Sequence, residues 1–387
     1  MSSTLHTQLK KVALLCIATT TLTHSCSKPE TADVDPREFI LKSWSNNLIL
    51  PEYQTFSEST ETLQTHVTSL CAEKTEANLE QAQQSWKTSR IHWKRTEIFA
   101  FGPYADFPDR FGTQLDFWPA RPETIETTLA ELGADIDAQT LSTLGAASRG
   151  LPAVEYFLFA TPQEDAAVIA TQDEILQHLN SDPTICIYLT AAAEDVHNQA
   201  VGIYQAWSPE HGDYYGKVVN PESYEDNMFM DRTESLSEVV NRMAFTIDNI
   251  RRDKLGKPAG ESTGAPSLES MESRYSQHAL ADIRANLEMI LWLFEGNKDI
   301  TDPDAYWLKD HPRLFVRQDL IDDFYANYEQ AITDLDVLEP SLEASINDDP
   351  QKALKAIDSL GELQKTIQVD IINALSLTRS FNDSDGD

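Results

Sequence analysis

Four acidic residues lie where a carboxylate can do chemistry: Glu97, Asp116, Glu155 and Glu272. Each lies in or beside a predicted loop or helix end, where its side chain can reach a cleft. A half-buried carboxylate is costly unless it meets a cation or hydrogen-bond donors. Carboxylate oxygens suit hard cations, and helical proteins can hold such sites. We therefore expect these residues to bind a ligand, with Glu97, Asp116 and Glu155 as candidate metal ligands.

A structural role is the alternative for each of the three candidate metal ligands. Glu97 follows Arg95 in a predicted helix, where the two can form an ion pair. Asp116 can hold the loop before Trp118 through backbone donors. Glu155 can cap the start of its own helix, because its carboxylate can reach back to unpaired N–H groups.

Cationic and aromatic residues near the same loops are further candidates. Lys257 and Arg274 can bind an anion or a carbonate-like co-ligand, although pairing with surface acids is the alternative in so acidic a chain. Trp118 is interpreted as a packing residue, with a ligand shelf as the alternative. His92 and His311 have no second His at helical spacing, and we expect them to be solvated or locally bonded.

The spacing of apolar residues is helical along almost the whole chain, which predicts an all-α fold with few residues in strands. The predicted helices are residues 36–72 with an interruption near Pro51, and residues 77–101, 183–207, 234–252, 268–295, 315–346 and 352–377.

Two domains are expected, because the chain is longer than one core usually serves. Residues 208–230 are rich in Pro, Gly and aromatic residues and show no clear period, so we place the boundary there. Residues 26–36 are interpreted as a linker. Residues 37–212 and 213–387 then form two helical bundles, whose similar layout suggests a distant duplication.

Residues 1–25 have the pattern of a signal peptide. Lys10 and Lys11 precede an apolar run over residues 12–22, which is too short to span a bilayer and is followed by small residues. The segment ending at Cys26 approximates a lipoprotein cleavage site, which predicts lipidation of Cys26; ordinary signal cleavage is the alternative. No Asp follows Cys26 to signal retention in the inner membrane. We therefore expect a periplasmic protein or a lipoprotein anchored in the outer membrane.

Cys71 and Cys186 remain in the mature chain, in an oxidising compartment. A structural disulfide is the leading interpretation, and two separately buried thiols are the alternative. No Cys/His cluster has the spacing of a zinc finger.

The formal net charge of −33 is spread along the sequence. Such a chain repels nucleic acid, and its acidity is typical of a solvated surface. There is no HExxH, P-loop, GxSxG or Gly-rich dinucleotide turn, so no motif of these enzyme classes suggests catalysis.

Five segments resemble, in order, those of the imelysin-like family. They are residues 93–103 (WKRTEIFAFGP), 116–119 (DFWP), 149–159 (RGLPAVEYFLF), 254–260 (KLGKPAG) and 271–286, the last with Glu272, Ser273, Ser276 and Asn286. The family's third motif reads GxHxxE, and its His and Glu are its proposed metal ligands. Here Pro152 stands at the His position and Glu155 at the Glu position.

The proline changes what this segment can do. Proline has no lone pair for a metal, whereas a neutral imidazole is a common ligand. Pro152 instead suits the first turn of a helix, where its missing N–H would be unpaired anyway, and Gly150 permits the bend before it.

The resemblance implies two helical bundles with a functional cleft between them. It also implies an envelope protein that binds a metal ion or metal complex, iron or another divalent or trivalent cation, in iron uptake. One alternative is a metallopeptidase of the imelysin type, which the loss of the motif His disfavours. The other is a non-catalytic surface module that docks to an outer-membrane protein. The expected ligand-binding residues are Glu97, Asp116, Trp118, Glu155, Lys257, Glu272, Ser273 and Arg274.

Overall fold

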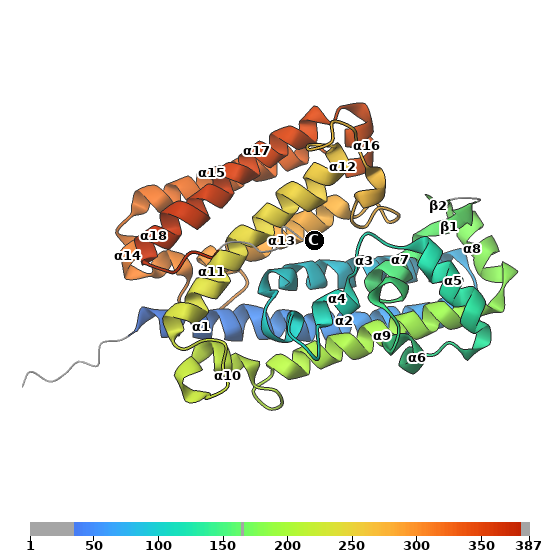
Figure 1. Ribbon diagram of the computed structural model, residues 1–387, viewed down its shortest axis with the longest axis horizontal. Coiled ribbons are helices and arrows are strands. Elements are labelled where there is room, and N and C mark those ends of the chain that lie inside the picture. Colours follow the sequence, from blue (N-terminus) through green and yellow to red (C-terminus); the bar gives the residue numbers. More distant parts are fainter. Residues whose placement is uncertain (1–34, 164–165, 381–387) are drawn as a thin grey trace, which may run out of the picture. The chain divides into compact units, whose positions relative to one another are not determined.

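The computed structural model describes residues 35–163 and 166–380, and the chain from Pro36 onward forms one compact unit. The predicted signal peptide, the lipidation of Cys26 and most of the linker lie outside the described residues. The regular elements of the described chain are helices and one short hairpin (Figure 1). The all-α prediction is confirmed.

The first helical run extends from Pro36 to Ala72. It consists of α1 (Pro36–Trp44), a π-helical stretch (Ser45–Ile49) and α2 (Leu50–Ala72). Pro51 lies in the first turn of α2, where a missing N–H is tolerated. The interruption expected near Pro51 is therefore a π-helical stretch in a continuous path.

The remaining N-terminal elements build a first group of helices. Thr75 caps α3 by accepting a hydrogen bond from the backbone of Asn78. Strands β1 and β2 are antiparallel, with Ala160 opposite Ile169. The elements are α3 (Glu76–Thr96), α4 (Phe111–Leu115), α5 (Pro122–Leu132), α6 (Ala138–Ser142), α7 (Gly150–Phe159), β1 (Ala160–Gln163), β2 (Ala166–Ile169), α8 (Gln172–Ser181), α9 (Pro183–Trp207) and α10 (Tyr214–Val219).

The second group follows in the C-terminal half. Two further π-helical stretches extend its helices, Ile250–Gly256 after α11 and Thr366–Ile371 after α17. The elements are α11 (Arg232–Asn249), α12 (Lys257–Ala259), α13 (Ala279–Glu295), α14 (Pro312–Phe315), α15 (Gln318–Asp336), α16 (Leu342–Asp348), α17 (Gln351–Lys365) and α18 (Ile372–Leu375).

Two predicted helices differ from the observed ones. The helix predicted over 268–295 begins only at Ala279, because the residues before it form turns in which Ser273 and Gln277 have left-handed backbones, with φ of 45° and 53°. The helix predicted over 315–346 is divided into α15 and α16, since Pro340 cannot continue a helix.

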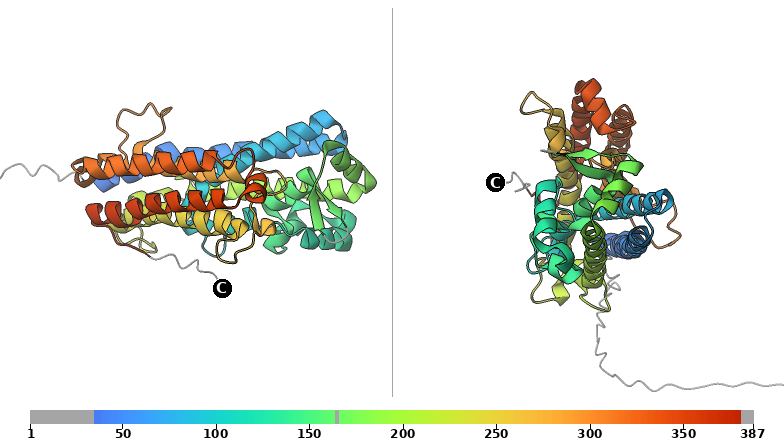
Figure 2. Two further views of the ribbon diagram at one scale, coloured as in Figure 1. Left: turned by 90° about the horizontal axis from the view of Figure 1, so that it is seen from above. Right: turned by 90° about the vertical axis from the view of Figure 1, so that its right-hand side faces the viewer.

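Packing within the unit joins the two groups along a seam. In the first group α2 packs on α3 and α9, and in the second α15 and α11 pack on α17. Helices α3 and α13 meet across the seam, and the long helices of both groups run side by side (Figures 1 and 2). No helix among the described residues is long and apolar enough to cross a membrane.

A disulfide joins Cys71, near the end of α2, to Cys186, in the first turn of α9, with the two Cα atoms 5.5 Å apart. It fastens two helices of the first group at one end.

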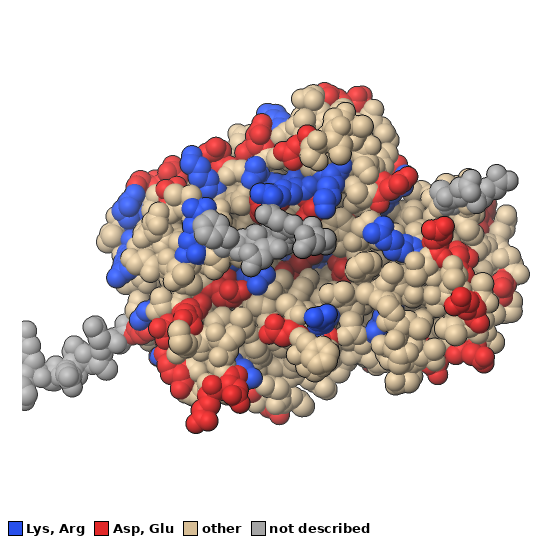
Figure 3. Space-filling model, viewed as in Figure 1, with Lys and Arg blue, Asp and Glu red and all other residues tan. Residues whose placement is uncertain are grey.

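Surface charge is uneven on the face drawn in Figure 3. Lys and Arg side chains gather over the segment that carries α11 and α12, while Asp and Glu are scattered over much of the remainder. The acidic net charge therefore does not exclude local cationic sites.

Candidate functional site

A cluster of charged side chains is buried at the seam, and α3 supplies its centre. Arg90, Lys94 and Glu97 follow one another at intervals of four and three residues, which places them on one face of the helical path. Arg90 and Lys94 are only 1% and 0% exposed. Charges this deeply buried are tolerated only when they are paired.

Arg90 is paired with three carboxylates. Its guanidinium nitrogens lie 2.6 Å from Asp116, 2.9 Å from Glu272 and 2.9 Å from Asp282. Asp116 belongs to the first group, whereas Glu272 and Asp282 belong to the second. Ser273 also donates a hydrogen bond to Asp282, at 2.5 Å. Arg90 therefore connects both groups to α3.

Lys94 lies among three carboxylates. Its Nζ is 2.8 Å from Glu97, 2.6 Å from Asp116 and 2.5 Å from Glu272. Lys254, from the π-helical stretch after α11, lies 2.6 Å from the other oxygen of Glu97 and 3.0 Å from Glu272. These charges form one network across the seam. We call this network, together with Arg90 and Asp282, the charge cluster.

The electrostatics of the charge cluster follow from burial and pairing. Burial alone raises the pKa of Glu97, but Lys254 and Lys94 bring this pKa below its ordinary value. The pKa of Asp116 is likewise lowered, because nearby guanidinium and ammonium groups outweigh burial. For Glu272 burial prevails, and its pKa is raised despite the neighbouring cations.

The carboxylates of Glu97, Asp116 and Glu272 have the arrangement of a metal site, since one oxygen from each lies within 4.8 Å of the others. The ammonium group of Lys94 contacts all three carboxylates. A metal ion in the same place would meet that positive charge at close range. The three residues therefore do not fit a metal while Lys94 stays among them.

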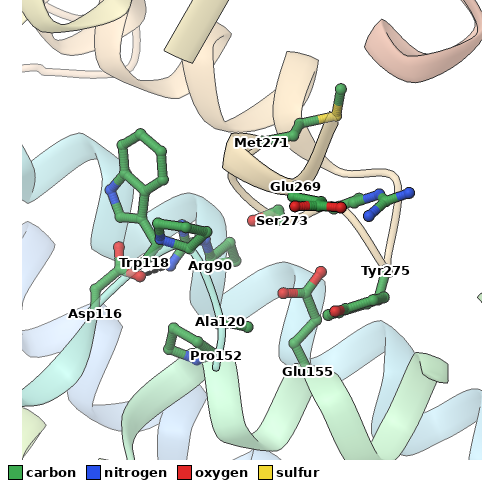
Figure 4. A pocket seen from close by; sticks show the side chains of 12 residues that line it. Arg90, Asp116, Trp118, Ala120, Pro152, Glu155, Glu269, Met271, Ser273 and Tyr275 are labelled. Atoms are coloured by element: carbon green, nitrogen blue, oxygen red, sulfur yellow. Dashed lines mark ion pairs between the residues drawn. The ribbon is translucent and has the colours of Figure 1, made fainter. Parts of the chain in front are cut away.

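A small pocket adjoins the charge cluster, with a cavity volume of about 20 Å³, enough for one water-sized ligand. Both groups of helices contribute to its wall, which Figure 4 shows from close by. Arg90 and Asp116 connect it to the charge cluster. The other lining residues that matter here are Trp118, Pro152, Glu155, Ser273, Arg274 and Tyr275.

Glu155 is a buried acid of this pocket with no ion pair among the described residues. It is 3% exposed, and its Oε1 accepts hydrogen bonds from the backbone N–H of Ser276 at 2.9 Å and from the Ser276 hydroxyl at 2.7 Å. The alternative that Glu155 caps its own helix is therefore wrong. Burial raises the pKa of Glu155 to about 7, which outweighs the opposing effect of the Ser276 donors.

Gly150 and Pro152 position Glu155. Gly150 has a φ of 76°, and a Cβ there would lie 2.5 Å from the carbonyl oxygen of Leu115. Pro152 lies in the first turn of α7, where its missing N–H is tolerated. Arg149, just before α7, is held by Asp195, with Nε and Oδ2 2.8 Å apart.

The structure brings together all but one of the residues expected to bind a ligand. The exception is Lys257, which is exposed on the surface with its Nζ 2.7 Å from Asp253. The other seven lie in the charge cluster, in the pocket or in both: Glu97, Asp116, Trp118, Glu155, Glu272, Ser273 and Arg274.

Some expected structural roles involve other partners. Arg95 does not pair with Glu97, because its guanidinium lies 2.8 Å from Glu288. Arg274 lines the pocket and also has its Nε 3.4 Å from Glu343. His92 is locally bonded, with Nδ1 2.6 Å from Glu52.

The cations of the charge cluster were not foreseen from the sequence. Arg90, Lys94 and Lys254 were missed because charged residues are usually solvated. A signal was present for two of them, since Arg90 and Lys94 share the buried stripe of α3 with Trp86 and Trp93. Charged residues in register with an apolar stripe indicate buried pairing.

Comparison with known proteins agrees with this architecture. The chain is 24% identical over 278 residues to iron-regulated protein A of Synechococcus elongatus, which covers 71% of this chain and 68% of that protein. It is similar in fold to an iron-regulated protein A precursor from Parabacteroides distasonis, with a TM-score of 0.71, 17% identity, and coverage of 89% of this chain and 95% of that one.

An imelysin-like protein from Psychrobacter arcticum is also similar in fold. The TM-score is 0.68 at 16% identity, with 90% of this chain and 99% of that chain covered. The family model described as imelysin matches residues 49–367, which is most of the sequence. The chain therefore belongs to the imelysin family.

Proposed function

We propose that this protein binds an iron ion at the pocket beside Glu155, and that it serves iron uptake in the cell envelope. The observation that carries the proposal is the state of Glu155. Ser276 holds one of its oxygens, and no described residue donates to the other. That second oxygen is available to a ligand in the pocket.

The chemistry of the pocket suits a hard cation. Carboxylate and hydroxyl oxygens from Glu155, Ser273 and Tyr275 lie along its wall, and oxygen ligands are preferred by hard cations such as ferric iron. Arg274 on the same wall can bind an anionic co-ligand of the metal. One relative is named iron-regulated, which supports a role connected with iron.

A metallopeptidase is less well supported. A catalytic zinc site usually has three protein ligands, most often including His. The described lining of the pocket contains no His. Pro152 stands where the family motif has His. The protein is therefore proposed as a binding protein and not as an enzyme.

The location and partners are part of the same proposal. Lipidation of Cys26 would anchor the chain to the outer membrane, where a membrane protein could receive the cargo. The predicted leader supports this placement.

Calorimetric titration of the mature protein tests the proposal. Ferric citrate, ferrous iron, zinc and calcium are each titrated into the wild type, Glu155→Gln and Pro152→His, with citrate alone as the ligand control. We expect saturable binding of iron, which Glu155→Gln weakens by about tenfold or more. Glu73→Gln, at an exposed carboxylate, serves as the matched control.

The three proteins separate the alternatives. Pro152→His adds an imidazole beside Glu155 and is expected to strengthen zinc and iron binding. If the wild type binds nothing and Pro152→His binds metal, the proline that stands at the position of the motif His has abolished metal binding in this chain. If neither protein binds iron, the proposal is wrong and partner docking becomes the better interpretation.

A further inference from the structure

A second cavity, with no lining residue in common with the pocket beside Glu155, is bounded by Glu97 and by α11. One face of α11 forms one wall, where Arg242, Phe245, Thr246 and Asn249 follow the spacing of a helical face. All four side chains are half-buried. Glu97 and Tyr104 lie opposite them, and the cavity volume is about 180 Å³. This volume is far larger than that of the first pocket.

Arg242 offers an unused hydrogen-bonding edge. Its Nε lies 2.6 Å from Glu238, and its guanidinium lies over the ring of Phe245, 5.8 Å from the ring centre. Its two terminal nitrogens have no partner within the described part of the chain. A guanidinium held in place with free N–H groups is well suited to bind a carboxylate.

Asn249 offers an acceptor that lacks a donor. Its Oδ1 is buried and has no hydrogen-bond partner in the described chain. Buried polar atoms are normally satisfied, and an exception requires an explanation. The π-helical stretch that begins at Ile250 follows directly, and such stretches are frequent at functional sites.

Glu97 adds a second acceptor on the opposite wall. Its carboxylate is held ionised by Lys94 and Lys254 but remains partly exposed to the cavity. The acceptors Asn249 and Glu97 therefore suit the N–H donors of a ligand, while Arg242 suits a negatively charged group. The helical rise places the Cα atoms of Arg242 and Asn249 roughly 10 Å apart, so the two ends of a ligand must be separated by a short chain.

We propose that this cavity binds a small zwitterion of amino-acid size, with its carboxylate on Arg242 and its ammonium group on Asn249 and Glu97. An ω-amino acid of a few carbons meets these requirements. Phe245 and the ring of Tyr104 cover the aliphatic part of such a ligand. This site is separate from the proposed iron site and does not depend on it.

The test uses three matched probes and the mature wild-type protein. The probes are 4-aminobutyrate, butyrate, which lacks the amine, and butylamine, which lacks the carboxylate. Calorimetry is expected to show saturable binding of 4-aminobutyrate that is about tenfold tighter than that of either control. Equal binding of all three, or no saturable binding of 4-aminobutyrate at millimolar concentrations, would overturn the proposal.

Variants locate the site. Arg242→Gln and Asn249→Ala are each expected to weaken 4-aminobutyrate binding by about tenfold, whereas Lys257→Gln, which removes an exposed cation, leaves it unchanged. Glu155→Gln also leaves it unchanged, which distinguishes this cavity from the iron site. Thermal melts of each variant show whether it is folded. Undiminished binding by folded Arg242→Gln and Asn249→Ala would contradict the proposal.

Discussion

Ser276 donates two hydrogen bonds to a single carboxylate oxygen of Glu155, one from its backbone and one from its hydroxyl, across 121 residues of sequence. The two donors come from the turns before α13, and the acceptor comes from α7. The pair therefore fixes the geometry of the pocket from both groups of helices at once.

Replacement of Glu155 by Gln is expected to change the pH dependence of stability. The pKa of Glu155 is raised from 4.5 to about 7 in the folded protein, so the folded state binds more protons than the unfolded state between these values. The stabilisation is present below about pH 4.5 and is lost as the pH rises through about 7. A shift of this size corresponds to about 3 kcal/mol.

Urea unfolding of the wild type and of Glu155→Gln at several pH values measures this effect. Relative to the variant, the wild type is expected to lose about 3 kcal/mol of unfolding free energy between acidic and mildly alkaline pH. Glutamine can still accept the bonds from Ser276, so the comparison isolates the ionisation. Parallel pH profiles for the two proteins would contradict the assignment.

Replacement of Lys94 by Met removes the ammonium group that lies among the carboxylates of Glu97, Asp116 and Glu272. Removal of one partner from a buried ion pair costs about 3–5 kcal/mol, because charges remain buried without compensation. A divalent cation can then take the place of the ammonium group. We expect calcium or manganese to raise the melting temperature of Lys94→Met but not that of the wild type.

The exposed Lys257→Met serves as the control for Lys94→Met, since it also removes a lysine charge. If Lys94→Met melts at the same temperature with and without divalent cations, the three carboxylates do not form a latent cation site.

Replacement of Gly150 by Ala tests the close approach that positions α7. The backbone there has a φ of 76°, and the added Cβ would lie 2.5 Å from the carbonyl oxygen of Leu115. We expect the free energy of unfolding to fall by about 1–3 kcal/mol. Gly145→Ala is the matched control, because no atom lies within 4 Å of a Cβ there and φ is −61°. Equal stability of the two variants would show that Gly150 has no such role.

Removal of the disulfide by Cys71→Ser with Cys186→Ser is expected to lower the free energy of unfolding. The bond closes a separation of 115 residues, and the loop entropy model gives about 4–5 kcal/mol for a loop of that order. Melting of the wild type with and without reductant, beside the double variant, measures the effect. A reduced wild type that melts like the oxidised one would exclude this contribution.

The helices were predictable where local signals and packing agreed. The helix predicted over 183–207 matches α9 because Asp182 caps it, Pro183 begins it and the apolar period is regular. The helix predicted over 268–295 failed at its start for the opposite reason. The turns there depend on hydrogen bonds from Ser273 to Asp282 and from Ser276 to Glu155, and a local pattern does not show such contacts.

The candidate site was predictable in its acids but not in its cations. Asp116, Glu155 and Glu272 were chosen because loops and a family resemblance marked them. Lys94 and Lys254 could not be chosen on that basis, since their roles depend on which carboxylates the other half of the chain brings to them. The pairing across the seam is a property of the tertiary structure.

The charge cluster also affects how the molecule unfolds. If the two groups of helices separated while each stayed folded, Arg90 and Lys94 would lose Glu272, and Lys254 would lose Glu97. Separation would also expose to water the surfaces of α3 and α13 that pack on each other, which is unfavourable. Amide hydrogens of α3 and α13 are therefore expected to exchange with solvent in a single cooperative opening, as one foldon.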